Sequence, residues 1–105
     1  MSDVAPQFET KDDLGTTSQF GGTVGTSPVS IPAVSGTEIQ EALIRCGVDN
    51  STSKRLLYSF DGGTTFATLS PGEYISWILK GGVTQVQIKG SAASVTYEVI
   101  LNREP

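Results

Sequence analysis

The chain has 105 residues, the length of one ordinary domain, with a formal net charge of −4, a single cysteine and no histidine. One cysteine excludes an internal disulfide, and the negative charge argues against nucleic-acid binding, which needs a positively charged surface. Without histidine the chain lacks the commonest general base and metal ligand, so we expect no enzyme, no metal site and no other cofactor.

Residues 1–22 differ from the rest of the chain. They carry most of the negative charge and few large apolar residues, which predicts a flexible acidic arm before a β-sandwich domain at 23–105. Two phenylalanines in this arm, Phe8 and Phe20, are candidate anchors onto a partner. The first residues are too polar for a secretory signal, and no apolar run approaches the roughly 18 residues of a membrane span. We therefore expect synthesis in the cytosol and no membrane contact.

A short edge strand is predicted next. Val29 and Ile31 alternate with a serine between two prolines, and prolines are tolerated at the edge of a sheet better than in its centre. An exposed edge strand can add to the sheet of a partner. Val29 and Ile31 therefore join the two phenylalanines as candidate partner-binding residues.

Residues 37–46 fit two periodicities. Ile39, Ala42, Leu43 and Cys46 fall at the spacing of one helix face. Ala42, Ile44 and Cys46 alternate as they would in a strand. Since every other segment of the chain predicts strands, a strand is favoured here, with a short helix as the alternative.

The remaining chain alternates between strands and turns. The predicted strands are 55–60, 64–69, 73–80, 83–89 and 95–101, and the turns between them are Asp61-Gly62-Gly63, Pro71-Gly72, Gly81-Gly82 and 90–94. Glycine at these positions accepts positive φ, and we expect the two Gly-Gly turns and the 90–94 loop to close hairpins. The sequence thus predicts an all-β fold, a small antiparallel β-sandwich or barrel of six to seven strands.

Two features could carry chemistry. The loop at 49–53 is rich in oxygen ligands, but it lacks the pattern of a calcium loop, so a connecting loop without a metal is expected. Trp77 could stack on a sugar ring, yet it falls in step with Ile75 and Leu79, which favours a place in the core.

Residues 56–73, LLYSFDGGTTFATLSPGE, and the closing strand at 94–101 resemble small virion proteins of tailed bacteriophages. In those proteins a strand ends in SFDGG and a shorter strand ends in L-x-PGE, and the resemblance covers residues 23–102. It implies a non-enzymatic virion component made in the host cytoplasm. The favoured member is a capsid decoration or cement protein that stabilises the head by binding across capsid subunits. A neck or tail accessory protein is the alternative position. The implied partners are the major capsid protein or other virion proteins.

Two further expectations concern association. The resemblance implies a homo-oligomer, either a trimer or a dimer, with no small-molecule substrate. A different class of function, a module that binds glycans or cell surfaces, would use exposed aromatic side chains. The residues available for it are Trp77, Tyr74, Tyr58 and Tyr97.

Overall fold

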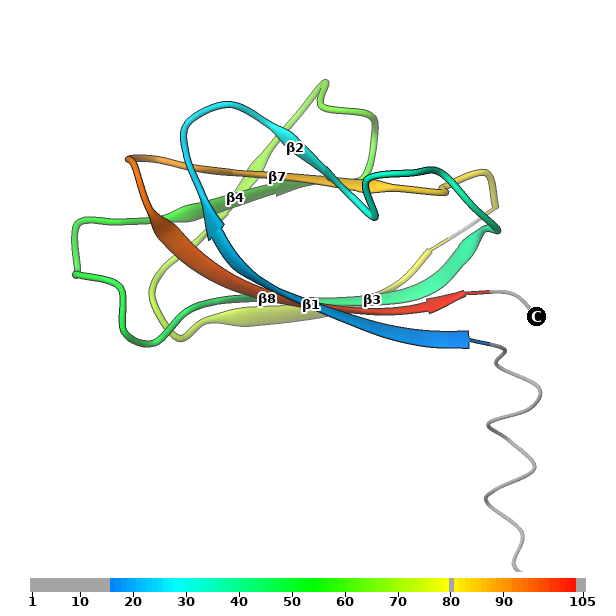
Figure 1. Ribbon diagram of the computed structural model, residues 1–105, viewed down its shortest axis with the longest axis horizontal. Coiled ribbons are helices and arrows are strands. Elements are labelled where there is room, and N and C mark those ends of the chain that lie inside the picture. The colour runs from blue at the N-terminus through cyan, green and yellow to red at the C-terminus, as the bar shows by residue number, and fades with distance from the viewer. Residues whose placement is uncertain (1–15, 80, 104–105) are drawn as a thin grey trace, which may run out of the picture.

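The protein is a two-layered β-sandwich (Figure 1). The computed structural model describes residues 16–79 and 81–103, and within these ranges it contains strands and no helix, so no described segment is a membrane-crossing helix. The strands are β1 (Thr16–Val24), β2 (Val29–Ile31), β3 (Ile39–Cys46), β4 (Leu56–Ser59), β5 (Ala67–Leu69), β6 (Tyr74–Ile78), β7 (Val86–Gly90) and β8 (Val95–Arg103). The predicted fold class is confirmed, with eight described strands in place of six or seven.

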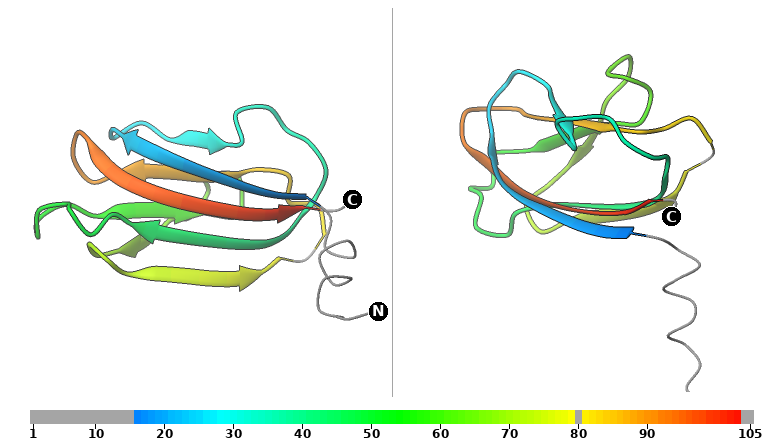
Figure 2. Two further views of the ribbon diagram at one scale, coloured as in Figure 1. Left: turned by 60° about the horizontal axis from the view of Figure 1, so that its bottom comes forward. Right: turned by 45° about the vertical axis from the view of Figure 1, so that its right-hand side comes forward.

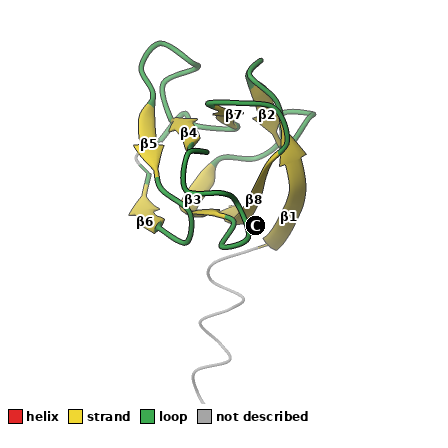
Figure 3. Cartoon of the chain, turned by 90° about the vertical axis from the view of Figure 1, so that its left-hand side faces the viewer, coloured by secondary structure: helices red, strands yellow, loops and turns green. Residues whose placement is uncertain are grey.

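The eight strands form two four-stranded sheets. Sheet A has the order β1-β8-β3-β6 and sheet B the order β2-β7-β4-β5, and all pairs are antiparallel. The chain changes sheet at every connection except that between β4 and β5, which gives the jelly-roll arrangement. The edge strands β1 and β2 lie at one rim of the sandwich, and β5 and β6 lie at the other (Figures 2 and 3).

The connections correct part of the hairpin prediction. Asp61-Gly62-Gly63 lies between two paired strands, as expected. Gly81-Gly82 and the 90–94 loop instead carry the chain from one sheet to the other, since β7 pairs with neither β6 nor β8. A glycine turn specifies a reversal of direction and leaves open whether the next strand pairs beside the last one or packs opposite it.

The first described strand corrects the boundary of the predicted arm. β1 pairs with β8 along its whole length, from Thr16 opposite Arg103 to Val24 opposite Val95, so residues 16–22 belong to the sandwich. Their sequence, TTSQFGG, has one large apolar residue and no alternation. This strand is therefore held by its ladder with β8 and carries little hydrophobic pattern of its own. Residues 1–15 lie outside the described part of the chain.

Strand β3 confirms the strand prediction and explains the conflicting periodicity. Its register against β8 shifts between Ile39 and Glu41, which marks a β-bulge. The extra residue moves Ile39 onto the same face as Ala42, so both are buried three positions apart, as in a helix. Beyond the bulge Ala42, Ile44 and Cys46 alternate regularly into the core.

The core fills the space between the sheets. Its buried members are Val24, Ile31, Ile39, Ala42, Ile44, Cys46, Leu56, Leu69, Val86, Ile88, Val95, Val99 and Leu101. They come mostly from the central strands β3, β7 and β8, which alternate inward and outward.

The SFDGG sequence builds the connection between β4 and β5. Ser59 Oγ donates to Asp61 Oδ1 at 2.6 Å and accepts from the backbone N–H of Gly63 at 3.0 Å. Asp61 also accepts from the backbone N–H of Thr64 and from both the N–H and the hydroxyl of Thr65. These side chains take up backbone donors that a strand ladder would use, so β4 and β5 are shorter than the predicted strands.

The L-x-PGE sequence builds the next turn. Gly72 follows Pro71 with φ of 85°, as a type II turn requires, and the N–H of Glu73 donates to the carbonyl of Ser70 at 2.9 Å. The carboxylate of Glu73 accepts from the N–H of Ser70 at 2.7 Å. Both motifs that carry the resemblance therefore have a direct role in forming turns.

Candidate functional site

Large exposed apolar side chains concentrate on one edge strand. Six are exposed among the described residues, and three of them belong to the five residues of β6. These three are Tyr74, Trp77 and Ile78, which are 62%, 60% and 71% exposed and which we call the β6 rim. Such a concentration on a small protein is typical of a surface that contacts another molecule.

The backbone of β6 is also open on one side. β6 ends the strand order of sheet A, so in the described chain it pairs only with β3. The N–H of Leu79 donates to the carbonyl of Gln40, and the carbonyl of Glu73 accepts from Cys46, so the odd-numbered residues face β3. Because backbone groups alternate along a strand, those of Tyr74, Ser76 and Ile78 point away from the sheet.

Trp77 is not the core residue that its spacing predicts. The register places it opposite buried Ala42, so it lies on the core side of sheet A together with Ile75, and this part of the prediction is correct. The sandwich ends at this rim, however, where the nearby strand of sheet B is the short β5 (Figure 3). Ala67 and Thr68 of β5 are themselves exposed, and this leaves most of the indole uncovered.

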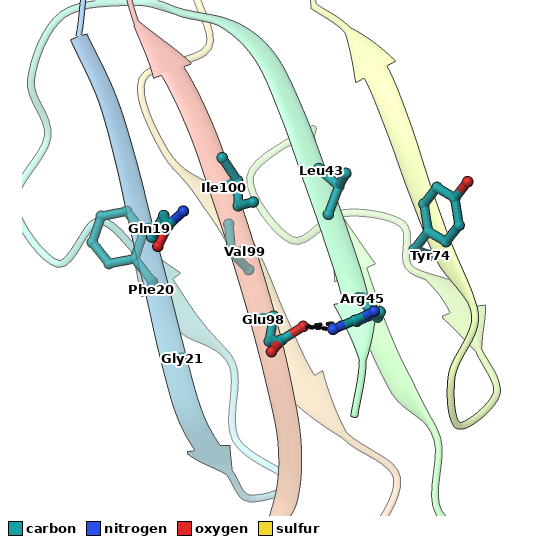
Figure 4. A pocket seen from close by; sticks show the side chains of 9 residues that line it. All are labelled: Gln19, Phe20, Gly21, Leu43, Arg45, Tyr74, Glu98, Val99 and Ile100. Atoms are coloured by element: carbon teal, nitrogen blue, oxygen red, sulfur yellow. Dashed lines mark hydrogen bonds and ion pairs between the residues drawn. The ribbon is translucent and has the colours of Figure 1, made fainter. Parts of the chain in front are cut away.

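Tyr74 of the β6 rim also lines a hollow of about 700 Å³ on the outer face of sheet A (Figure 4). We call this the outer hollow. Leu43 and Ile100 form an apolar patch between Gln19 on one side and the Tyr74 ring on the other. Residues of all four strands of sheet A line the outer hollow.

An ion pair crosses one end of the outer hollow. Arg45 on β3 binds Glu98 on β8, and its Nε donates to the carboxylate at 2.7 Å. Both side chains are partly exposed, so the pair contributes little to stability. A second hollow of about 550 Å³ begins beyond it, beside Gly21 and Gly22, whose lack of side chains opens the surface.

The residues predicted to bind a partner are scattered. Phe20 packs against the core from β1 and lines the outer hollow. Val29 is exposed on β2, which is an edge strand as predicted, whereas Ile31 on the same strand is buried in the core. Phe8 lies outside the described residues. The structure therefore does not bring the three described side chains together into one surface.

The pattern of residues 74–78 could have indicated the β6 rim. This segment is apolar on both faces of a strand in a chain with only 17% charged residues. Both faces of a strand are apolar when it is covered on both sides, or when it is an edge that meets a partner. The sequence does not reveal which strand ends the sheet, so the apolar pattern alone does not distinguish a covered strand from an edge strand.

The loop at 49–53 is tied to β8 by side chains. Asn50 Nδ2 donates to the carbonyls of Gly47 and Thr96 at 3.0 and 3.1 Å, and its Oδ1 accepts from the N–H of Thr96 at 2.9 Å. Asp49 accepts from the hydroxyl of Thr96 at 2.7 Å. The side chains of Asp49 and Asn50, whose oxygens were considered as calcium ligands, thus hold the loop in place. No group of three or more acidic or cysteine side chains gathers anywhere in 16–79 and 81–103.

No protein-family model matches the sequence, and no curated protein is significantly similar to it. A solved structure from Bacillus endospore appendages, which form a family of disulfide-linked pili, is 18% identical with a TM-score of 0.54, covering 86% of this chain and 87% of that chain. A de novo designed double-stranded β-helix is 15% identical with a TM-score of 0.47, covering 85% of this chain and 99% of that chain. At this level of identity, the likeness to the appendage protein establishes a shared fold.

Proposed function

We propose that this protein is a non-enzymatic structural subunit that assembles with other protein chains through the β6 rim. The observation that carries the proposal is the combination of an open backbone edge with three exposed apolar side chains on one strand. An edge of this kind is prone to pair with another chain unless a partner covers it. Aromatic residues of this type are also enriched at the centres of protein interfaces.

The finer part of the proposal is a virion component of a bacteriophage, made in the host cytoplasm and positioned as a capsid decoration or cement protein. It is supported by the resemblance of residues 56–73 and 94–101 to such proteins. Bound across capsid subunits, the protein would stabilise the assembled head by mass action, because it binds the assembled form and not the separate subunits. A neck or tail position is the alternative.

The appendage protein of similar fold offers a second precedent for assembly, since it belongs to a family of disulfide-linked pili. The present chain would have to assemble differently. Its single cysteine, Cys46, is fully buried in β3 and is unavailable to a neighbouring subunit. Assembly through the β6 rim requires only backbone hydrogen bonds and apolar contact.

The proposal is tested by mass spectrometry of purified phage particles that encode this sequence, with heads and tails separated. We expect the chain in stoichiometric amounts in the head fraction. Its presence only in the tail fraction would support the alternative position, and its absence from both would overturn the proposal.

The role of the β6 rim is tested by adding the purified chain to particles that lack it and measuring the bound fraction by sedimentation. We expect Trp77→Ser to weaken binding by about 10- to 30-fold, the effect of removing an aromatic side chain central to an interface. Val34→Ser is the matched control, since Val34 is 80% exposed and lies outside β6. Equal binding by the two variants would contradict a role for the β6 rim.

A glycan-binding module is the second candidate function, because Trp77 and Tyr74 are exposed. The two rings lie on opposite faces of β6, however, and Tyr58 and Tyr97 pack against the core, so the four aromatics form no common platform. A change in tryptophan fluorescence on titration with a panel of oligosaccharides would support this function in place of the structural one.

A further inference from the structure

We infer that the partner of the β6 rim is the β6 strand of a second copy of this chain, paired antiparallel about a two-fold axis at Ser76. This inference rests on the proposed function, because both use the β6 rim, and it adds the identity of the partner and the register. Sheet A of one copy would then continue into sheet A of the other as one eight-stranded sheet.

The backbone of β6 fits this register. Tyr74, Ser76 and Ile78 are the residues whose backbone groups face outward. Antiparallel pairing centred on Ser76 places Ser76 opposite itself and Tyr74 opposite Ile78 of the other copy. Every outward-facing residue then meets another outward-facing residue, so each N–H and C=O along the free edge finds a partner. A shift by two residues would leave part of this edge unpaired.

The side chains are self-complementary in the same register. On the outer face, Tyr74 of each copy lies beside Ile78 of the other. On the core face, Ile75 of each copy lies beside Trp77 of the other, which would cover the indole that β5 leaves exposed. Aromatic residues opposite β-branched residues are favourable cross-strand pairs. No charge occurs in residues 74–78, so the two identical strands do not repel one another.

The other edge strands lack this combination. β2 and β5 have three residues each, and β2 is flanked by prolines. β1 has nine residues but is mainly Thr, Gly and Ser, with one large aromatic side chain that packs inward. Short length protects β2 and β5 from pairing with another chain, and flanking prolines also protect β2. Among the described strands, β6 is the apolar edge strand with neither protection.

The interface would be small. Each aromatic side chain of the β6 rim is about 60% exposed, which corresponds to on the order of 100–150 Å² per ring available for burial. A typical stable interface buries about 800 Å² per partner, so the pair belongs with the smaller, weaker contacts. We expect the isolated chain to be monomeric when dilute and dimeric at higher concentration, and that dependence can be measured.

The experiment is a light-scattering series from micromolar to millimolar protein on the wild type, Ser76→Lys and Thr68→Lys. The wild type should rise from 11.0 kDa towards twice that mass. Ser76→Lys places two ammonium groups opposite one another at the axis and should remain monomeric. Thr68→Lys makes the same change at an exposed position on edge strand β5 and should dimerise like the wild type. Circular dichroism confirms that each variant is folded.

A cross-linking experiment tests the register without a disruptive charge. Since Cys46 is buried, Ser76→Cys introduces one accessible thiol, which a short bis-maleimide should join to its counterpart in the second copy. Ser27→Cys, exposed between β1 and β2 at the opposite rim, should give no dimer above background.

Three results would overturn the inference: a wild type that stays monomeric throughout, a folded Ser76→Lys that associates like the wild type, or equal cross-linking at positions 76 and 27. Masses beyond a dimer would also oppose it, because a two-fold pair is closed. The proposed function is tested by a separate measurement, the presence of the chain in particles, so a failure of the self-pairing is distinguishable from a failure of the proposed function.

Discussion

Asp61 shows how one side chain organises a loop. Its carboxylate accepts hydrogen bonds from Ser59, Thr64 and Thr65, and the bond from the Ser59 hydroxyl is the largest of the causes that hold the pKa of Asp61 well below its usual value of 3.8. The bonded partners favour the charged form of the carboxylate. The acidic residue of the SFDGG sequence therefore stabilises the folded hairpin only while it is ionised.

A pH dependence follows for Asp61. Because its pKa is lower in the folded protein than in the unfolded chain, its contribution to stability is complete above about pH 4 and is lost as the pH falls further towards its folded pKa. We expect Asp61→Asn to lower the midpoint of thermal unfolding at pH 7 and to lessen its fall between pH 4 and pH 2. An unchanged slope in that range would show that Asp61 contributes nothing to acid sensitivity.

Asn50 acts as a substitute for a strand residue. Its side-chain amide donates to the carbonyl of Thr96 and accepts from the N–H of the same residue, as a neighbouring strand would. We expect Asn50→Ala to lower the free energy of unfolding by about 1–3 kcal/mol, because it leaves the partly buried N–H of Thr96 without its acceptor. Chemical denaturation measures this loss.

The control for Asn50 is Asn102→Ala. Asn102 also makes hydrogen bonds, but to the exposed or partly exposed side chains of Thr17 and Glu41, so its loss should cost under about 1 kcal/mol. Similar losses for the two variants would contradict the role assigned to the Asn50 amide.

Individual strands were predictable where their pattern was regular. β7 and β8 alternate clearly, and each appears close to its expected position. β1 was missed because its residues show no apolar alternation of their own, although they pair with β8 along their whole length. The helical spacing in β3 came from a bulge, a feature that depends on the register with a neighbouring strand and is absent from any single-strand pattern.

Strand β6 yields a spectroscopic prediction. Trp77 is the chain's one tryptophan, so its fluorescence reports directly on this edge. Since the indole is mostly exposed, we expect emission near that of free tryptophan in water and strong quenching by acrylamide in dilute protein. Quenching should weaken as concentration rises and β6 becomes covered. A blue-shifted, protected emission at high dilution would place the indole in the core instead.

At the scale of the whole molecule, the sequence predicts the class of fold and leaves the topology open. Turn residues and alternation indicate an all-β sandwich because both are local properties. Which sheet receives each strand depends on contacts between distant residues, so the sequence predicts hairpins at Gly81-Gly82 and 90–94, where the chain in fact crosses between the sheets. The β6 rim was missed for the same reason, since only the strand order reveals which strand lies at the edge.

The pairing of β1 with β8 has a mechanical consequence. Thr16 lies opposite Arg103, so the described chain enters and leaves the sandwich at the same end (Figure 2). A force that pulls these two residues apart acts across the ladder and breaks its hydrogen bonds in sequence, beginning at Thr16. Tension applied through the flanking chain would therefore peel β1 away at low force, whereas a load applied along the strands would have to shear many bonds at once.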